Sequence, residues 1–225
     1  QVRLQTPFGC NFVQPTSIDG ATIFVQNGGH VVREFLYTDV EDAYSATAIS
    51  TTASHLINEP RFMAVSHGAF SSSESYAFMT TNDGTLALFN SNRAEKRASW
   101  MRVVTDGEFH AVCAVHERTF ALITEASPTG TSTVKLCEFA GEIGLDQYVS
   151  GTIDGDGYLD VSDRYAIGDT VDVVSDDGTQ HYGQFTVVAG PAPSNTPGVY
   201  FTNINSVGAH AGLAFEAKIE GNPVD

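Results

Sequence analysis

Apolar and polar positions alternate along most of the chain in short runs rich in Val, Ile, Phe, Tyr and Thr. Alternation with a period of two is typical of β-strands that bury one face, and turn-forming dipeptides separate the runs. In the first part of the chain the pattern predicts strands over residues 21–26, 31–38, 61–67, 76–81, 85–90, 99–105, 109–116, 119–126 and 133–140. The alternation therefore predicts an all-β fold of antiparallel strands.

The turn signals between these strands have a physical basis. Gly after Asn or Asp adopts the positive φ angles that tight hairpins require. Turns are expected at Asn27-Gly28-Gly29, Asn82-Asp83-Gly84, Asp106-Gly107 and Pro128-Thr129-Gly130. One segment, 39–57, is rich in Ala and Ser and lacks the alternation, so it is expected to be a loop with one short helix.

The order of strands repeats loosely within this part of the chain. A unit from about Arg61 to Val104 combines apolar strands, an Asp-Gly turn, an Arg-rich connection and a strand with Trp100, and a degraded copy covers 109–139. Repeats of about 40–45 residues with four antiparallel strands are typical of β-propeller blades. Three blades cannot close a ring, so residues 1–145 are expected to form a partial, propeller-like set of sheets with Trp100 in its core.

The last third of the chain reads as a separate module. Its strands are expected at 158–165, 169–177, 180–190, 198–204 and 213–221, joined by Gly, Asp, Pro and Asn. A length of about 80 residues is enough for five or six strands. Residues 146–225 are therefore predicted to form a small acidic β-barrel, which joins the first module near 145–150.

Charge narrows the possible partners. The chain carries 11 basic and 27 acidic residues, a formal net charge of −16. Residues 1–145 hold 15 acids and 9 bases, and residues 146–225 hold 12 acids and 2 bases, so the second module carries most of the excess. Binding to nucleic acid requires clustered Lys and Arg that neutralise phosphates. The acidic excess therefore argues against a nucleic-acid-binding protein. The nearest approach to a basic cluster is expected to be a solvated run, formed by Arg93, Lys96, Arg97 and Arg102.

The cysteines and the hydropathy of the chain indicate the cellular compartment in which it is made. Three cysteines without CxxC spacing signal neither a disulfide framework nor a four-ligand zinc site, so Cys10, Cys113 and Cys137 are expected to be reduced, mostly buried thiols of a protein made in a cytoplasm. No run of eighteen apolar residues predicts a membrane span, and no leader opens the chain. A start at Gln1 rather than Met is expected of a processed product or of a piece of something longer.

Acidic residues concentrate in one stretch, 154–177, where eight aspartates stand among glycines and β-branched residues. The spacing resembles a calcium loop, but an EF-hand needs an oxygen donor, a glycine and a bidentate acid at positions that here hold Tyr158, Leu159 and Tyr165. Two interpretations stay open. The simpler one is that these acids form solvated turns, and the other is a different calcium site made by Asp154, Asp156 and Asp160.

Signatures of catalysis are otherwise missing from the sequence. The seven histidines show neither HxH nor HExxH spacing, so each is expected to be a surface or half-buried side chain. There is no GxSxG, GxGxxG or GxxxxGK(S/T) motif. We therefore expect no catalytic residue and no cofactor. Paired carboxylates for glycoside hydrolysis stay open, because their separation is a three-dimensional property.

A series of short motifs resembles a pattern in tail proteins of short-tailed phages. The run 21–35 reads ATIFVQNGGHVVREF and is followed by Tyr37, Tyr44, Ala48 and His55-Leu56-Ile57. Further matches follow in order at Met63-Ala64, 76–80, 83–86, 98–100, Asp106-Gly107, 136–139, Leu145-Asp146, Val207-Gly208 and 214–220. Together these motifs are similar to those of the tail tubular protein B, or nozzle, family of phages and prophages. Members of that family are much longer than this chain, and their usual His pair after the Trp is Met101-Arg102 here.

The resemblance implies a non-enzymatic structural protein of the virion tail, assembled in the host bacterial cytoplasm. Such proteins look like ring-forming parts of the tail tube, built from β-propeller domains and a small β-domain similar to the FCCH domain of ubiquitin-activating enzymes. It implies a homo-oligomeric ring in the full-length protein, contacts with other phage tail proteins, and DNA that passes through without specific binding.

The charge agrees with a conduit, because acidic walls repel phosphates over a Debye length of about 8 Å. Two alternatives of other classes are a phage-associated polysaccharide-degrading enzyme that uses two carboxylates, and a glycan- or calcium-binding module that uses the Asp-rich stretch.

Overall fold

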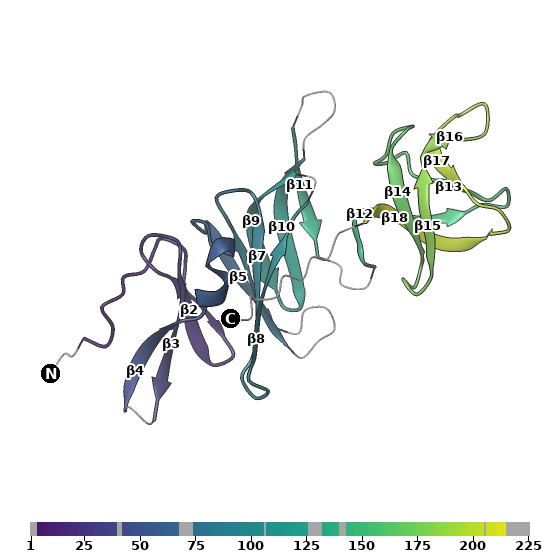
Figure 1. Ribbon diagram of the computed structural model, residues 1–225. Helices are drawn as coiled ribbons and strands as arrows, with labels where there is room; N and C mark the ends of the chain where they lie inside the picture. Colours follow the sequence, from purple (N-terminus) through teal and green to yellow (C-terminus); the bar gives the residue numbers. More distant parts are fainter. Residues whose placement is uncertain are drawn as a thin grey trace, which may run out of the picture. The chain divides into compact units, whose positions relative to one another are not determined.

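The computed structural model describes residues 4–39, 42–67, 74–105, 107–125, 132–139, 143–204 and 206–214. Within these ranges the chain is all-β, every strand pair is antiparallel, and no sheet closes on itself. In the part of the chain so described, no helix has the length and apolar character needed to cross a membrane. The chain divides into two compact units, Gln1–Phe139 and Ala140–Asp225 (Figure 1).

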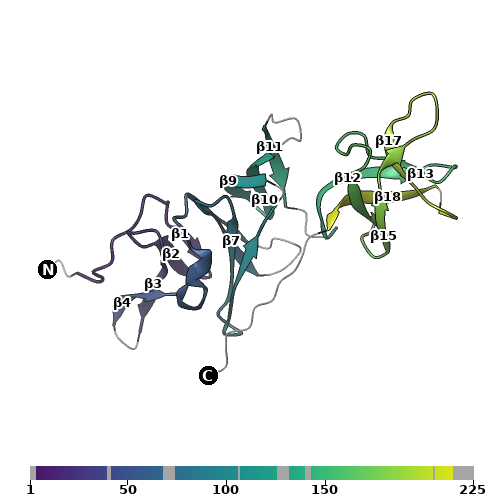
Figure 2. The same cartoon turned by 45° about the horizontal axis from the view of Figure 1, so that its top comes forward.

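The first unit contains three sheets, and each follows the chain as a meander of neighbouring strands (Figures 1 and 2). Their strands are β1 (Thr16–Ile18), β2 (Ala21–Val25), β3 (Val32–Thr38) and β4 (Ala43–Ala48); β5 (Phe62–His67), β6 (Ser75–Thr80), β7 (Leu86–Asn92) and β8 (Arg97–Val103); and β9 (Gly107–Val115), β10 (Arg118–Glu125) and β11 (Thr133–Glu138). All nine strands expected here are present, with ends shifted by at most two residues. The prediction of an all-β fold is confirmed.

The sheets pack face to face, and the middle sheet is covered on both faces. The cluster that it shares with the first sheet contains Ile18, Ile23, Val32, Ala77, Met79, Ala87 and Phe89. The cluster that it shares with the third sheet contains Phe78, Leu86, Leu88, Phe109, Val112, Ala121 and Ile123. Consecutive residues of β6 and β7 thus alternate between two cores, which is why these strands are apolar at nearly every position.

The first strands of the three sheets lie next to one another, β1 beside β5 and β5 beside β9. Polar groups buried at this junction find partners there. Ser66 in β5 donates a hydrogen bond to the carbonyl of His116 (3.3 Å), and Thr80 in β6 donates one to the carbonyl of His110 (3.5 Å). The junction is therefore held by side-chain hydrogen bonds as well as by apolar packing.

Trp100 anchors the middle sheet to the connection that precedes it. Its ring packs on Phe89 with a centroid separation of 4.7 Å, and its Nε1–H donates to the carbonyl of Ile49 (3.0 Å). Trp100 is partly buried and packs against the core cluster, so the core position predicted for it is confirmed in part.

The loop expected within 39–57 is wrong for residues 43–48, which form the edge strand β4. This strand pairs with β3 from Thr38 opposite Ala43 to Arg33 opposite Ala48. An edge strand needs one partner only, so backbone pairing offsets the weak strand propensity of Ala and Ser. The short helix is present as the 3-10 helix η1 (Thr51–Leu56).

The second unit has two sheets around one core. The larger sheet has the order β12 (Leu145–Ile153), β18 (Val207–Ala214), β14 (Thr170–Ser175), β15 (His181–Thr186), and the smaller has the order β13 (Tyr158–Asp160), β17 (Pro197–Tyr200), β16 (Val188–Ala189). The core contains Ile153, Leu159, Val161, Val171, Val173, Val187, Val199, Ala209 and Ala211. Strands far apart in the sequence therefore share this core.

Several strand boundaries in this unit differ from expectation. The segment 145–150, expected at the junction of the modules, belongs to strand β12. The expected strand 158–165 ends at Asp160, because Val161 accepts hydrogen bonds from Arg164 and Tyr165 in a turn. Strand 180–190 is split into β15 and β16. Strand 213–221 lies largely outside the described residues.

Candidate functional site

Asp154 and Asp160, two of the three possible calcium ligands, each cap a turn. Asp154 Oδ1 accepts hydrogen bonds from the backbone N–H groups of Asp156 (2.9 Å) and Tyr158 (2.8 Å), and Asp160 Oδ1 accepts one from Ser162 (2.9 Å). Across the described ranges, no group of three or more His, Cys, Asp or Glu side chains could hold a metal ion. The geometry thus favours the simpler interpretation, in which these aspartates form turns.

One carboxylate in each unit closes a hairpin. Asp83 Oδ1, between β6 and β7, accepts hydrogen bonds from the hydroxyls of Thr81 (2.5 Å) and Thr85 (2.8 Å). Burial raises the pKa of Asp83, but these hydrogen bonds outweigh it and the net pKa is lowered. Asp177, between β14 and β15, accepts from Ser175 Oγ (2.5 Å) and Thr179 Oγ1 (2.8 Å), and these hydrogen bonds, with one from the Thr179 N–H, lower its pKa to about 2.

His210 is buried and joins two neighbouring segments in the second unit. Ser150 on β12 lies opposite His210 on β18, with Oγ 2.8 Å from Nδ1. Nε2 lies 3.0 Å from the Asp176 carbonyl, and because a carbonyl oxygen can only accept, Nε2 donates this hydrogen bond. The Asp176 side chain is 76% exposed, unlike the buried carboxylate that orients the ring in a hydrolase triad. The expectation of surface or half-buried histidines is wrong for His210, because this cross-strand pair places its ring inside.

Two open grooves run along β7 and β8, and each is lined by a single carboxylate. Glu34, in the first groove, forms an ion pair with Arg93, and Glu74, in the second, forms one with Arg97 (3.1 Å). Glycoside hydrolysis needs two carboxyl groups on either side of the scissile bond. Neither groove therefore supports the hydrolase alternative.

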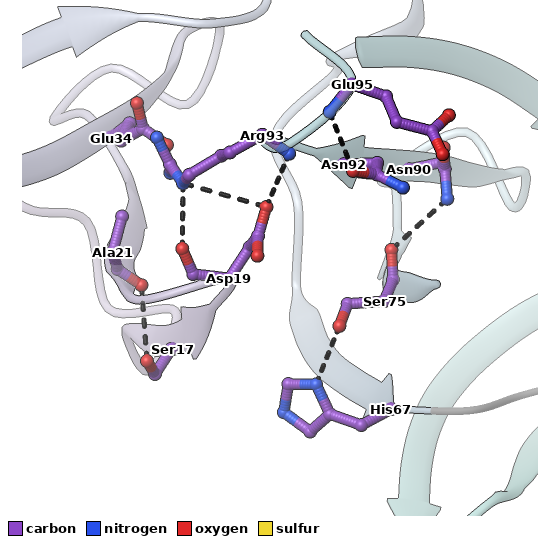
Figure 3. A network of polar contacts seen from close by, with 10 residues as sticks. All are labelled: Ser17, Asp19, Ala21, Glu34, His67, Ser75, Asn90, Asn92, Arg93 and Glu95. Atoms are coloured by element: carbon purple, nitrogen blue, oxygen red, sulfur yellow. Dashed lines mark hydrogen bonds and ion pairs between the residues drawn. The ribbon is translucent and has the colours of Figure 1, made fainter. Parts of the chain in front are cut away.

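Arg93, which directly follows β7, clamps the second sheet to the first (Figure 3). Its backbone N–H donates to Asp19 Oδ2 (2.8 Å), its Nε–H donates to the Asp19 carbonyl (2.7 Å), and its guanidinium forms an ion pair with Glu34 of β3. Asp19 sits in the β1–β2 turn with a φ of 49°, in the left-handed region that Asp tolerates better than most residues. This clamp joins two hairpins that are 74 residues apart in sequence.

Arg97, a second member of the basic cluster, is paired with acids. Arg97 is 60% exposed and forms ion pairs with Glu74 and Glu95. The expectation of a solvated run is right for Arg97 and wrong for Arg93, which is 32% exposed because it lies between two sheets.

The third sheet presents an apolar face away from the second. On β10, Ala121 and Ile123 are buried against the second sheet, so Phe120 and Leu122 point the other way. The strand register places Leu136 opposite Leu122. Val134 and Leu136 are 61% and 70% exposed. We define the outward face of the third sheet as Ala111, Cys113, Val115, Phe120, Leu122, Val134 and Leu136.

Cys113 on this face is exposed, as is Cys10, while Cys137 is half-buried, and all three are free. The expectation of mostly buried thiols is therefore wrong. Cys113 is accessible because it points out from the face of the third sheet that points away from the second sheet.

An ion pair borders the outward face of the third sheet. Arg118 Nε donates to Glu138 Oε1 (2.5 Å), and the guanidinium lies over the ring of Phe120, 5.1 Å from its centroid. The hydrogen bond from Arg118 lowers the pKa of Glu138. The pair is neutral as a whole, so the face has an apolar centre and no net charge at this border.

The first sheet also has a face that points away from the middle one. Phe35 stacks on Tyr44 with ring centroids 4.9 Å apart, and Tyr37 meets Tyr44 edge-on at 5.3 Å. Part of this face is covered, because the ring of Phe8 lies 3.3 Å from the Arg33 guanidinium carbon. Tyr37 and Tyr44 remain 43% and 46% exposed. We define the outward face of the first sheet as Thr22, Phe35, Tyr37, Tyr44 and Ala46.

No protein-family model and no curated protein matches this chain. Nothing in the described residues points to an enzymatic activity. We therefore infer the function from the stacked sheets, the charge and the outward faces of the first and third sheets.

The sequence held a signal for the outward face of the third sheet. Residues 120–123 of β10 read FALI and residues 76–79 of β6 read YAFM, so both strands are apolar at consecutive positions. Such a run predicts a strand that is covered on both faces. The sheets of the described chain cover both faces of β6 but only one face of β10.

Proposed function

We propose that the chain is a structural component of a phage tail tube, part of a nozzle-like ring through which DNA leaves the particle. The observation that carries this proposal is the stack in the first unit. Its consecutive antiparallel meanders pack face to face with their first strands adjacent. The blades of a β-propeller are meanders of this kind around a central channel. In this proposal the first unit is part of a propeller, and the second unit is a small barrel-like β-domain.

The motifs shared with the nozzle family occupy structural positions, which supports a scaffold rather than a reaction site. Gly28 and Gly29 form the β2–β3 turn with φ angles of 103° and 75°, and Gly84 forms the β6–β7 turn with a φ of 77°. Trp100 joins the middle sheet to the carbonyl of Ile49. These four residues therefore set the path or the packing of a sheet.

The acidic turns of the second unit support a passage that repels DNA. Seven of the eight aspartates between 154 and 177 are exposed; they are Asp154, Asp156, Asp160, Asp163, Asp169, Asp176 and Asp177. In the proposed ring these carboxylates face the lumen, where they repel phosphates and keep DNA from binding to the wall.

Localisation in particles tests the function directly. Particles of the phage or prophage that encodes the chain are labelled with an antibody to it, and electron microscopy is expected to place the label on the tail tube. Particles made without the gene for this chain are the control. Label on the capsid alone, or ordinary particles that contain none of the protein, would contradict the proposal.

A map of the assembled ring tests the charge assignment separately. Acidic turns on the outer surface of the ring, around a neutral lumen, would overturn the lumen assignment and leave the tail function intact.

A further inference from the structure

We propose that residues 4–10, which we call the arm, guard the free edge of the first sheet. In this proposal the arm keeps strand β4 from pairing with a further strand, and its displacement opens the edge to an extended peptide. The proposal goes beyond the proposed function and takes nothing from it, because it concerns how a single sheet of the first unit keeps its edge closed.

Strand β4 is an edge strand of a kind that invites pairing. It is the last strand of its sheet, so within the described residues only one side of its backbone pairs with a strand. Its sequence, AYSATA, contains neither a charged residue nor a proline, the residues with which proteins commonly protect an exposed edge. The corresponding edge strands of the other two sheets contain two charged residues each, which are Arg97 and Arg102 in β8 and Lys135 and Glu138 in β11. The edge at β4 therefore needs another form of protection.

The arm supplies this protection at one backbone group of β4. The N–H of Tyr44 donates a hydrogen bond to the side-chain oxygen Oε1 of Gln5 (3.2 Å). This N–H thus points away from β3, toward the side on which a further strand would pair. Gln5 occupies the place of the acceptor that such a strand would bring.

Arg33 caps a second group on the same side of β4. Residues two apart in a strand direct their backbone groups to the same side, so the N–H and the carbonyl of Ala46 also face the free edge. The Arg33 side chain reaches across from β3, and its Nη1 donates to the Ala46 carbonyl (2.9 Å). Two neighbouring residues of the edge are therefore already capped by side chains.

The arm also holds Arg33 where it can cap Ala46. The Phe8 ring centroid lies 3.3 Å from the guanidinium carbon, within the range of a cation–π contact. Nε of Arg33 donates to Gln26 Oε1 (2.7 Å), which fixes the side chain from the other side. Displacement of the arm therefore removes the cap from Gln5 and frees Arg33 in the same step.

The arm is fixed at one end and weakly held at the other. At its fixed end, Cys10 forms a β-bridge with Gln26, and the Asn27 N–H donates to the Gly9 carbonyl (2.8 Å). Toward the other end it contacts the sheet through Gln5 and Phe8, and both of these residues are exposed. Segments with few buried contacts open at low free-energy cost, so the arm can leave the edge while the sheet stays folded.

The partner that fits a released edge is an extended peptide. The groups that the arm covers on β4 are backbone N–H and carbonyl groups, and strand addition satisfies such groups through main-chain hydrogen bonds. Phe35 and Tyr44 stack beside this edge with ring centroids 4.9 Å apart. A strand with apolar residues at alternate positions therefore fits it best, because cross-strand pairs of aromatic and β-branched residues are stabilising.

Peptide binding tests the proposal. The probe is a fluorescent peptide VVREFLYT, which has the sequence of residues 31–38 and includes β3, the strand that β4 already pairs with. Fluorescence anisotropy is expected to show no binding to the unaltered chain and saturable binding to the double variant Gln5→Ala, Phe8→Ala. Phe12→Ala is the matched control, because Phe12 lies just beyond the arm and is fully exposed, and it is expected to behave like the unaltered chain.

A further substitution assigns the binding to the edge of β4. Ala46→Pro removes the N–H that faces the free edge, a position at which edge strands tolerate proline. Added to the double variant, it is expected to abolish peptide binding. Far-UV circular dichroism and Trp100 fluorescence verify that each variant is folded.

Hydrogen exchange gives a readout that needs no peptide. The Tyr44 amide is expected to exchange about fivefold faster in the double variant, the size expected for one lost hydrogen bond. In the Phe12→Ala control its exchange is expected to be unchanged.

Four results would overturn the proposal. They are equal binding of the peptide to the unaltered chain and the double variant, no binding to either, binding that Ala46→Pro leaves intact, and unaltered exchange of the Tyr44 amide in the double variant. None of them bears on the presence of the protein in the tail, which electron microscopy of particles tests independently.

Discussion

The two units bury apolar residues in different ways. In the first unit, strands that are neighbours in sequence are neighbours in space, and the cores lie between successive sheets. In the second unit, the first strand β12 pairs with the last strand β18, and one core is shared by strands from the whole unit. The first arrangement can be extended by adding sheets, whereas the second is self-contained.

Carboxylates close local turns in both units, as Asp83 does in the first, but the first unit also uses charge between sheets. In the first, the guanidinium of Arg93 links the turn at Asp19 to Glu34, so charge holds separate sheets together. In the second, Asp154 and Asp177 accept hydrogen bonds from residues two to four positions away, so charge shapes local turns.

Core truncation is expected to have the largest effect and to be confined to one unit. Phe78→Ala removes a fully buried aromatic ring from the cluster between the second and third sheets. Leu159→Ala removes a fully buried aliphatic side chain from the core of the second unit. Each is expected to cost about 3–5 kcal/mol. Because Trp100 is the one tryptophan in the sequence, its fluorescence during urea unfolding reports the first unit.

Hydrogen exchange at β14 reports the second unit in the same samples. Phe78→Ala is expected to lower the urea midpoint seen by Trp100, and Leu159→Ala to speed exchange at β14 only. A shift of the Trp100 midpoint by Leu159→Ala would show that the units are coupled, and would break the comparison.

Replacing one glycine in each unit by alanine is expected to have the next largest effect on stability, and a different one in each unit. Gly84 and Gly157 both have a φ of 77°. A Cβ on Gly84 would lie 2.8 Å from Cγ of the flexible Glu108 side chain, whereas a Cβ on Gly157 would lie 2.4 Å from the backbone carbonyl oxygen of Phe201. Gly84→Ala is expected to cost about 1–2 kcal/mol for the left-handed conformation alone, and Gly157→Ala about 3 kcal/mol or more. Thermal unfolding measures both, and equal losses would contradict the comparison.

Loss of the inter-sheet clamp is expected to have a smaller effect. Arg93→Met removes the hydrogen bond to the Asp19 carbonyl and leaves Glu34, which is 17% exposed, without its cation. We expect a loss of about 1–2 kcal/mol, measured by urea unfolding with Trp100 fluorescence. Arg97→Met is the control, and because Arg97 is 60% exposed it is expected to cost about 0.5 kcal/mol or less. If both variants behave alike, the clamp has no role in holding the sheets.

The pH dependence of the Asp177 hairpin is expected to be the smallest effect. The pKa of Asp177 is lowered from 3.8 to about 2 in the folded chain. A lowered pKa adds stability that is present above about pH 4 and is lost as the pH falls toward 2. Asp177→Asn is expected to remove this loss, as measured by hydrogen exchange at β14 between pH 5 and pH 2. Asp154→Asn serves as the comparison, and an unchanged pH profile in Asp177→Asn would count against the assignment.

The sequence predicts the first unit better than the second for a physical reason. Hairpins such as the one at Asn82-Asp83-Gly84 depend on local turn chemistry, so their strands can be located from alternation. The pairing of β12 with β18 joins residues more than 50 positions apart and depends on the shared core. Strand β4 was not predicted because its sequence, AYSATA, has no apolar alternation and the strand is held by pairing with β3.

Candidate sites follow the same division. The turn-forming role of Asp154 and Asp160 could be anticipated from their Asp-Gly surroundings. The Arg93 clamp and the pair of Ser150 with His210 could not, because each joins segments that only the fold brings together. The exposed apolar residues of the third sheet lay between these cases, since they can be found in the sequence but their exposure depends on the fold.

The pairing of Leu145 with Ala214 has a consequence for how the second unit can be used. The first residue of β12 and the last described residue of β18 therefore lie side by side at one end of the larger sheet. A unit attached in this way can be spliced into a surface loop of an unrelated protein, or removed from its own, without pulling the flanking segments apart.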